Sequence, residues 1–156
     1  MSSAHSGFWA GRTIDESGGF GVGVLILAAD LPNEVREILT GANQAHVATV
    51  MPDGSPHSVP VWVDLEGDRV AILTDPRSRK ARNLQRDPRV AISITHRDHP
   101  NHMAQIRGRV TDRVEGDPAW EIIDRMSQKY LGMPYPLRTD RVVFLIEPER
   151  AWSQRF

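Results

Sequence analysis

The chain has 156 residues, 40% of them hydrophobic and 25% charged, and this predicts one globular domain with one core. The formal net charge is −1, which excludes general binding to nucleic acids or anionic membranes, because both need a broad excess of basic residues. The absence of cysteine excludes disulfides, thiolate metal sites, iron–sulfur clusters and cysteine nucleophiles.

The first 29 residues are rich in glycine and serine and have no clear helical or strand period. We predict that residues 1–29 form a partly disordered N-terminal extension, and that residues 30–156 form the folded domain. The apolar run Phe20–Ala29 is shorter than the roughly 20 residues that a membrane-spanning helix needs. It is also not expected to be a secretory signal, because such a signal needs positive charge before its apolar run and little precedes this one. We therefore expect a cytoplasmic protein that makes no contact with a membrane.

The first predicted helix begins at Asp30-Leu31-Pro32, with Asp30 as its cap, and ends at Gly41. A second short helix is predicted over about Ser78–Arg86. A longer one opens at Asp117-Pro118, with apolar side chains spaced along one face.

Between and after these helices, apolar and polar residues alternate with the period of a β-strand. This alternation predicts six strands, at His46–Val50, Pro56–Leu65, Arg69–Thr74, Val90–Ile94, Met103–Arg113 and Val142–Glu147. Gly108 is expected at a bulge or bend. Six antiparallel strands with short turns and few helices indicate a mainly β (α+β) fold, a small closed barrel with peripheral helices.

The segment Thr74–Leu84 is the strongest chemical signal in the sequence. It carries Arg77, Arg79, Lys80 and Arg82 where a strand leads into a helix. The N–H groups at a helix N-terminus suit a phosphate, and Ser78, Arg79 and Lys80 can add hydrogen bonds to it. A solvated basic helix face explains the same pattern equally well.

The segment Pro56–Val63 is the second signal. Pro60 cannot donate a ladder hydrogen bond, so we expect it at a sheet edge or a bulge. Free backbone groups beside an apolar floor suit the rim of a flat heteroaromatic cofactor. Trp62 alone is equally explained by packing in the sheet.

The histidines give weaker signals. His99 and His102 are three residues apart, but Pro100 interrupts any helix that would place them on one face, so we predict a polar loop and no metal site around His96, His99 and His102. His57, at a strand start, is predicted to be merely exposed.

Several segments, in this order, resemble the actinobacterial F-420-dependent members of the pyridoxamine-phosphate-oxidase-like superfamily, whose fold is the FMN-binding split barrel. The resemblance covers roughly Asp30 to Trp152. It rests on His57–Trp62, Arg79–Leu84, Asp87–Ala91, Ile106–Val110, Lys129–Gly132 and Pro134–Pro136. The C-terminal segment Glu149–Phe156 lacks the basic Arg-Leu-type motif of true pyridoxamine-phosphate oxidases, so oxidation of vitamin B6 is not expected.

The resemblance implies a six-stranded split β-barrel that forms a homodimer, with the cofactor in grooves at the subunit interface. The cofactor phosphate would contact Ser78, Arg79 and Lys80, with Arg82 or Asn83 near the helix start. The cofactor ring would lie along Ser58, Val59, Pro60, Val61 and Trp62, with Thr74 close by. A loop at Pro134 and Tyr135, supplied by one or the other subunit, would close part of the pocket.

The function implied is that of a reductase or dehydrogenase that uses coenzyme F-420 to transfer a hydride to or from a small conjugated organic substrate. Tyr135 or solvent would supply the proton. Two alternatives remain open: an FMN-binding flavoprotein of the same fold, and a non-catalytic module that holds a flavin, a deazaflavin or haem.

Overall fold

The computed structural model describes residues 13–14, 20–21 and 30–156. Within the first 29 residues, β1 (Thr13–Ile14) and β2 (Phe20–Gly21) pair with each other in antiparallel orientation. The prediction of a partly disordered extension otherwise lies outside the described residues.

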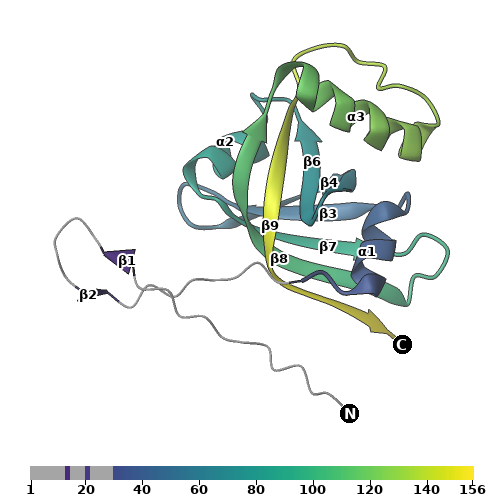
Figure 1. The fold of residues 1–156 in the computed structure, drawn as a ribbon, viewed down its shortest axis with the longest axis horizontal. Coiled ribbons are helices and arrows are strands. Elements are labelled where there is room, and N and C mark those ends of the chain that lie inside the picture. Colours follow the sequence, from purple (N-terminus) through teal and green to yellow (C-terminus); the bar gives the residue numbers. More distant parts are fainter. Residues whose placement is uncertain (1–12, 15–19, 22–29) are drawn as a thin grey trace.

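The folded domain is a single curled antiparallel sheet with three helices around it (Figure 1). The strand order in the sheet is β4-β3-β7-β8-β9-β6-β5. The strands are β3 (Ala45–Val50), β4 (Pro56–Val61), β5 (Val63–Glu66), β6 (Arg69–Thr74), β7 (Arg89–Thr95), β8 (His102–Val114) and β9 (Val142–Arg155). The helices are α1 (Asn33–Thr40), α2 (Arg79–Arg86) and α3 (Gly116–Leu131).

The sheet has seven strands and not the six predicted from the sequence. The predicted strand Pro56–Leu65 breaks at Trp62 into β4 and β5, which lie at opposite ends of the sheet. The chain thus leaves its partner β3 at Trp62 and turns to pair with β6. Periodicity could not reveal this corner, because alternation continues across it.

The first helix begins later than predicted. Its N-cap is Pro32, which makes no side-chain capping hydrogen bond, so the assignment of Asp30 as the cap is wrong. The other two helices follow the predicted positions, and Ser78 caps α2.

Strands β8 and β9 form the longest ladder of the sheet, and β9 continues to Arg155, well past the predicted end at Glu147. The register shifts between Arg107 and Gly108, which confirms the expected irregularity. A Cβ atom at Gly108 would lie 2.2 Å from the Glu147 carbonyl oxygen, so only glycine fits this close approach.

Two hydrophobic clusters form the core. The larger one fills the interior of the curled sheet and is closed by α1, whose Val35, Ile38 and Leu39 are fully buried. The smaller one lies between α3 and the outer side of β6 and β9, around Ile123 and Met126. Within the described part of the chain, no helix is long and apolar enough to cross a membrane.

Candidate functional site

The turn from β6 into α2 places two hydroxyl groups at the helix N-terminus. The Oγ1 atom of Thr74 lies 2.8 Å from the Oγ atom of Ser78. The same Ser78 oxygen accepts the N–H of Ala81 at 3.2 Å, which caps the helix. Both hydroxyls predicted for the site therefore lie together, where the helix dipole is positive.

The basic side chains of α2 differ in exposure. Arg79 and Arg82 are exposed, whereas Lys80 is only partly exposed. Burial lowers the pKa of Lys80 below its ordinary value, the charge of Arg141 lowers it further, and Asp75 opposes both effects. Lys80 thus lies in a partly desolvated place beside a second positive charge, and a bound anion would offset the repulsion between the two charges.

Asn83 does not share this environment. Its side chain is fully buried, and its Nδ2 donates to the Oγ1 of Thr49 at 2.9 Å. Asn83 therefore ties α2 to β3 and faces the interior, so a phosphate contact by Asn83 does not fit this position.

Arg141, just before β9, is a basic residue that the sequence reasoning missed. Its guanidinium lies 3.9 Å from the Asp75 carboxylate and 5.7 Å from the centroid of the Tyr135 ring, and its side chain is only 12% exposed. Arg141 thus joins the start of α2 to the loop after α3. The only signal in the sequence that could have found Arg141 is that it is a basic residue near Tyr135.

An aromatic cluster covers the corner between β4 and β5. The Trp62 ring stacks on Tyr130, with centroids 4.8 Å apart and an interplanar angle of 3°. The edge of Tyr135 meets Trp62 at 5.9 Å and 90°. The Tyr135 loop therefore closes over the Trp62 corner of the same chain.

This loop, residues 132–141, is held to α3 by one carboxylate. Asp124 accepts the N–H of Tyr135 at 2.9 Å and the guanidinium of Arg138 at 2.9 Å to each oxygen. Burial raises the pKa of Asp124, but these hydrogen bonds outweigh it and leave the pKa below its ordinary value. Arg138 also lies over the Trp120 ring, at 4.6 Å.

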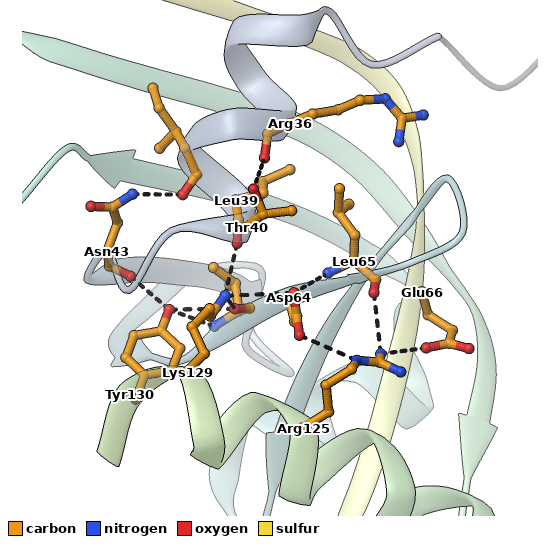
Figure 2. A network of polar contacts seen from close by, with 12 residues as sticks. Arg36, Leu39, Thr40, Asn43, Asp64, Leu65, Glu66, Arg125, Lys129 and Tyr130 are labelled. Atoms are coloured by element: carbon orange, nitrogen blue, oxygen red, sulfur yellow. Dashed lines mark hydrogen bonds and ion pairs between the residues drawn. The ribbon is translucent and has the colours of Figure 1, made fainter. Parts of the chain in front are cut away.

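The end of α3 packs beside this corner, and Figure 2 shows its Tyr130 side chain directed at Asn43. The Tyr130 hydroxyl donates to the Asn43 carbonyl at 2.7 Å and accepts the N–H of Val63 at 3.2 Å. Burial raises the pKa of Tyr130 to about 12, so the phenol stays protonated at neutral pH.

Lys129, the neighbour of Tyr130, makes a second set of contacts in the same place (Figure 2). Its ammonium group donates to the carbonyls of Leu39 and Val63 and lies 3.6 Å from Asp64. The Lys129-Tyr130 pair of the resemblance thus anchors the backbone that carries Trp62.

Strand β4 presents two different faces. Val59 and Val61 point toward the core, whereas Ser58 and Pro60 are exposed. The strand pairs only with β3, so Pro60 lies on an end strand, as its missing N–H requires.

The three histidines of the β7–β8 connection are brought together by the hairpin. The His96 ring lies 5.0 Å from His99 and 5.9 Å from His102. The Nδ1 atom of His96 accepts the N–H groups of Asp98 and His99, so this nitrogen is already occupied. Among the residues the structure describes, no group of three or more His, Cys, Asp or Glu side chains is placed to hold a metal ion.

The Trp62 corner, the 132–141 loop and the start of α2 are therefore neighbours, and together they make up the candidate site. A chain of contacts links Trp62 to Tyr135, Tyr135 to Arg141, and Arg141 to Asp75 beside Thr74. The arrangement combines an aromatic wall with a cationic corner, which suits a planar ligand that carries an anionic group.

The family model described as "Pyridoxamine 5'-phosphate oxidase" matches residues 31–155. No curated protein matches the chain.

Several solved structures are similar to this chain. One, titled "F420 Reductase", is 28% identical, with a TM-score of 0.68 over 78% of this chain and 98% of that chain. The conserved hypothetical protein Rv2991 from Mycobacterium tuberculosis is 25% identical, with a TM-score of 0.67 over 81% of this chain and 88% of that chain. General Stress Protein 26 from Bacillus anthracis, at 20% identity and a TM-score of 0.61 over 78% of this chain and 91% of that chain, shares the fold.

Proposed function

Because the chain belongs to the pyridoxamine 5'-phosphate oxidase family, whose members bind flavin-type cofactors, we propose that it is an oxidoreductase that uses coenzyme F-420. It transfers a hydride between this cofactor and a small conjugated organic substrate. The similarity to the structure titled "F420 Reductase" supports the choice of cofactor. The contact chain from Trp62 to Asp75 is the observation that carries the proposal.

The residues of the site fit such a cofactor. Arg79 is exposed at the first turn of α2, and Lys80 lies beside Arg141 in a positive environment with a lowered pKa. Together with Ser78 they would hold the phosphate, because charged donors at a helix N-terminus favour an anion. Arg82, also exposed on α2, would add a further positive charge.

The ring would lie along Ser58–Trp62, with Thr74 near its phosphate end. Trp62 and Tyr135 form an aromatic wall, and Pro134 and Tyr135 belong to the loop that Asp124 fixes. Bound coenzyme F-420 supplies hydride chemistry at its ring carbon C5, so the protein itself needs to provide position and exclusion of water.

The protein also has to deliver a proton. Tyr135 is half-buried next to Trp62, and its position makes it the proton donor that we propose, with solvent as the alternative source. Tyr130 is not suited to this role, since its hydroxyl is already hydrogen-bonded to the backbone and its pKa is raised to about 12 by burial.

Titration with the two cofactors tests the proposal. The purified protein is expected to be colourless and to raise the fluorescence polarisation of added coenzyme F-420. It should then catalyse oxidation of the reduced cofactor by an electron-poor conjugated substrate. Stoichiometric FMN in the purified protein would identify an FMN flavoprotein and overturn the choice of cofactor. Tight F-420 binding without turnover of any substrate would indicate a binding module.

We further propose that the protein acts as a homodimer, with each cofactor at the subunit interface. Strand β4, which would carry the ring, is an end strand of the sheet and leaves one edge without a neighbouring strand in the described chain.

A further inference from the structure

A cavity lies between α1, the β7–β8 connection (residues 96–101) and the end of β9, which are close together in Figure 1. Its volume is about 610 Å³, within the range of roughly 300–1,000 Å³ that is typical of small-molecule sites. His102, which lines it, is buried on the same face of β8 as the core residues Ala104 and Ile106. The cavity therefore lies on the inner side of the sheet, and it shares no residue with the candidate cofactor site.

Hydrogen bonds to the backbone hold the walls of this cavity together. The buried Asn43 side chain donates to the Ile38 carbonyl of α1 at 2.7 Å and accepts the N–H of Arg97 at 2.8 Å. At the end of β9, the N–H of Phe156 donates to the Asn101 carbonyl at 3.2 Å. The cavity is thus formed before any ligand enters, which lowers the cost of binding.

Two imidazole rings of the lining offer hydrogen bonds to a ligand. The Nδ1 atom of His96 accepts two backbone N–H groups, so the proton of the neutral ring lies on Nε2. The His102 ring stacks beside it, with centroids 5.9 Å apart, and the residue is only 6% exposed. The Nε2 atom of His102 has no hydrogen-bond partner in the described part of the chain. Buried polar atoms without a partner are rare in proteins, and a ligand in the adjoining cavity would supply the missing bond.

The cavity is lined by charges of both signs that do not neutralise one another. Arg155 is the ladder partner of His102 and so lies on the same face of the sheet. Glu37 of α1 and Asp98 of the β7–β8 connection line the same cavity. Among the described residues, none of the three charged side chains forms an ion pair.

The electrostatics of His102 show that both signs act on the same place. Burial lowers the pKa of His102 and the charges of Arg155 and His96 lower it further, whereas Glu34 and Glu37 oppose them. A ligand with one positive and one negative group would pair with both the cation and the carboxylates. An ion of one sign would leave the opposite set without a partner.

An apolar part completes the lining. Ile38, whose side chain is fully buried, belongs to the wall that α1 forms, and Phe156, which is 75% exposed, borders the cavity at the end of β9. An exposed phenylalanine ring is stabilised when another apolar group covers it. The lining therefore favours a ligand that has an apolar body besides its two charges.

We propose that this cavity binds a free α-amino acid with an apolar side chain. The α-carboxylate accepts hydrogen bonds from Arg155 and from Nε2 of His102, and the α-ammonium group donates to Glu37 and Asp98. The apolar side chain packs against Ile38. The inference does not depend on the proposed redox function, because the two sites have no residue in common.

Titration calorimetry with three matched probes tests the site. We expect L-phenylalanine to bind the full-length protein. The probe 3-phenylpropanoate lacks the ammonium group and 2-phenylethylamine lacks the carboxylate, so both should bind at least about tenfold more weakly. Equal binding of the three probes, or no binding of L-phenylalanine, would overturn the site.

Two variants separate the two charges of the ligand. Arg155→Gln should remove the preference for L-phenylalanine over 2-phenylethylamine and keep the preference over 3-phenylpropanoate. Glu37→Gln/Asp98→Asn should do the reverse. If both preferences survive in both variants, the ligand charges do not contact these residues and the proposal fails.

Matched controls remove exposed charges that do not line the cavity. Arg97→Gln and Asp117→Asn/Glu121→Gln should leave the affinity for L-phenylalanine unchanged, and a loss equal to that of the cavity variants would refute a local site. Conversion of a dimer into a monomer by Arg155→Gln, measured by light scattering, would assign this arginine to a subunit contact and would refute it as well.

Discussion

At the scale of single residues, the site depends on how differently neighbouring side chains are placed. Arg79, Lys80 and Asn83 all lie on the short helix α2. Arg79 is exposed, Lys80 is partly buried beside Arg141, and Asn83 is in the core. A helix turns its side chains through 100° per residue, so a run of candidate residues cannot all face one ligand. Only Arg79 and Lys80 of these three are free to meet a phosphate.

We predict that Arg79→Ala/Lys80→Ala weakens the binding of coenzyme F-420. Each lost charge-assisted hydrogen bond is worth about 1.5–3 kcal/mol, so the dissociation constant should rise tenfold or more. Fluorescence polarisation of the cofactor measures this. The double variant Arg36→Ala/Arg97→Ala is the control for a general change in charge. An affinity equal to that of the wild type in the first variant would show that the phosphate binds elsewhere.

The pair Lys129-Tyr130 shows that a motif shared with a family can have a structural role. Tyr130 bonds to Asn43 and Val63, and Lys129 bonds to Leu39 and Val63, so both act on the backbone beneath Trp62. Three segments distant in the sequence meet at this point. The residue types alone gave no indication of these partners.

At the scale of elements, α3 and the 132–141 loop act as one unit. Asp124 on α3 accepts hydrogen bonds from Tyr135 and Arg138, and Tyr135 in turn contacts Trp62. Asp124 therefore ties the loop to α3, together with the contact of Arg138 with the Trp120 ring.

We predict that Asp124→Asn loosens this loop. Asparagine can still accept the Tyr135 N–H but loses the charge that holds Arg138, which is about half exposed, so the loss of stability should be only about 1 kcal/mol. Hydrogen exchange of residues 133–141 should accelerate several-fold while exchange in β7 and β8 stays unchanged. Uniform acceleration across the domain would contradict a local role.

The same carboxylate makes the loop sensitive to acid. The pKa of Asp124 is lowered in the folded protein, so its stabilising contribution is complete above the ordinary value of 3.8 and is lost as the pH falls through the lower folded value. In wild type, exchange of residues 133–141, corrected for the intrinsic pH dependence of exchange, should therefore rise only below about pH 4, and Asp124→Asn should remove this step. A step that persists in Asp124→Asn would show that another group titrates.

Elements with clear end signals were predictable from the sequence, and corners were not. Ser78 before the basic run marked the start of α2 correctly, and Asp117-Pro118 marked the start of α3 to within one residue of Gly116. The break at Trp62 left the alternation intact, and the polar second half of β9 looked like a tail. Both features arise from pairing with distant strands, which local periodicity does not record.

At the scale of the whole molecule, the homodimer is the main untested prediction. Light scattering of the purified protein should give twice the chain mass of 17.5 kDa. If the cofactor lies at the interface, added coenzyme F-420 should also shift the dissociation of the dimer to lower protein concentration, because ligand binding to the assembled state favours it. A monomer at the concentrations used for cofactor binding would contradict the interface site.

The sequence by itself determined most of the helices and strands, the mainly β class and the basic run after β6, because capping residues, alternation and charge runs act over a few neighbouring residues. Only the tertiary structure decided that Trp62 is a corner, that Asn83 is buried, that Arg141 joins the site, and that His102 lies opposite Arg155. Each of these depends on strand pairing or packing between segments far apart in the chain. Such contacts form only when the sheet curls and brings those segments together.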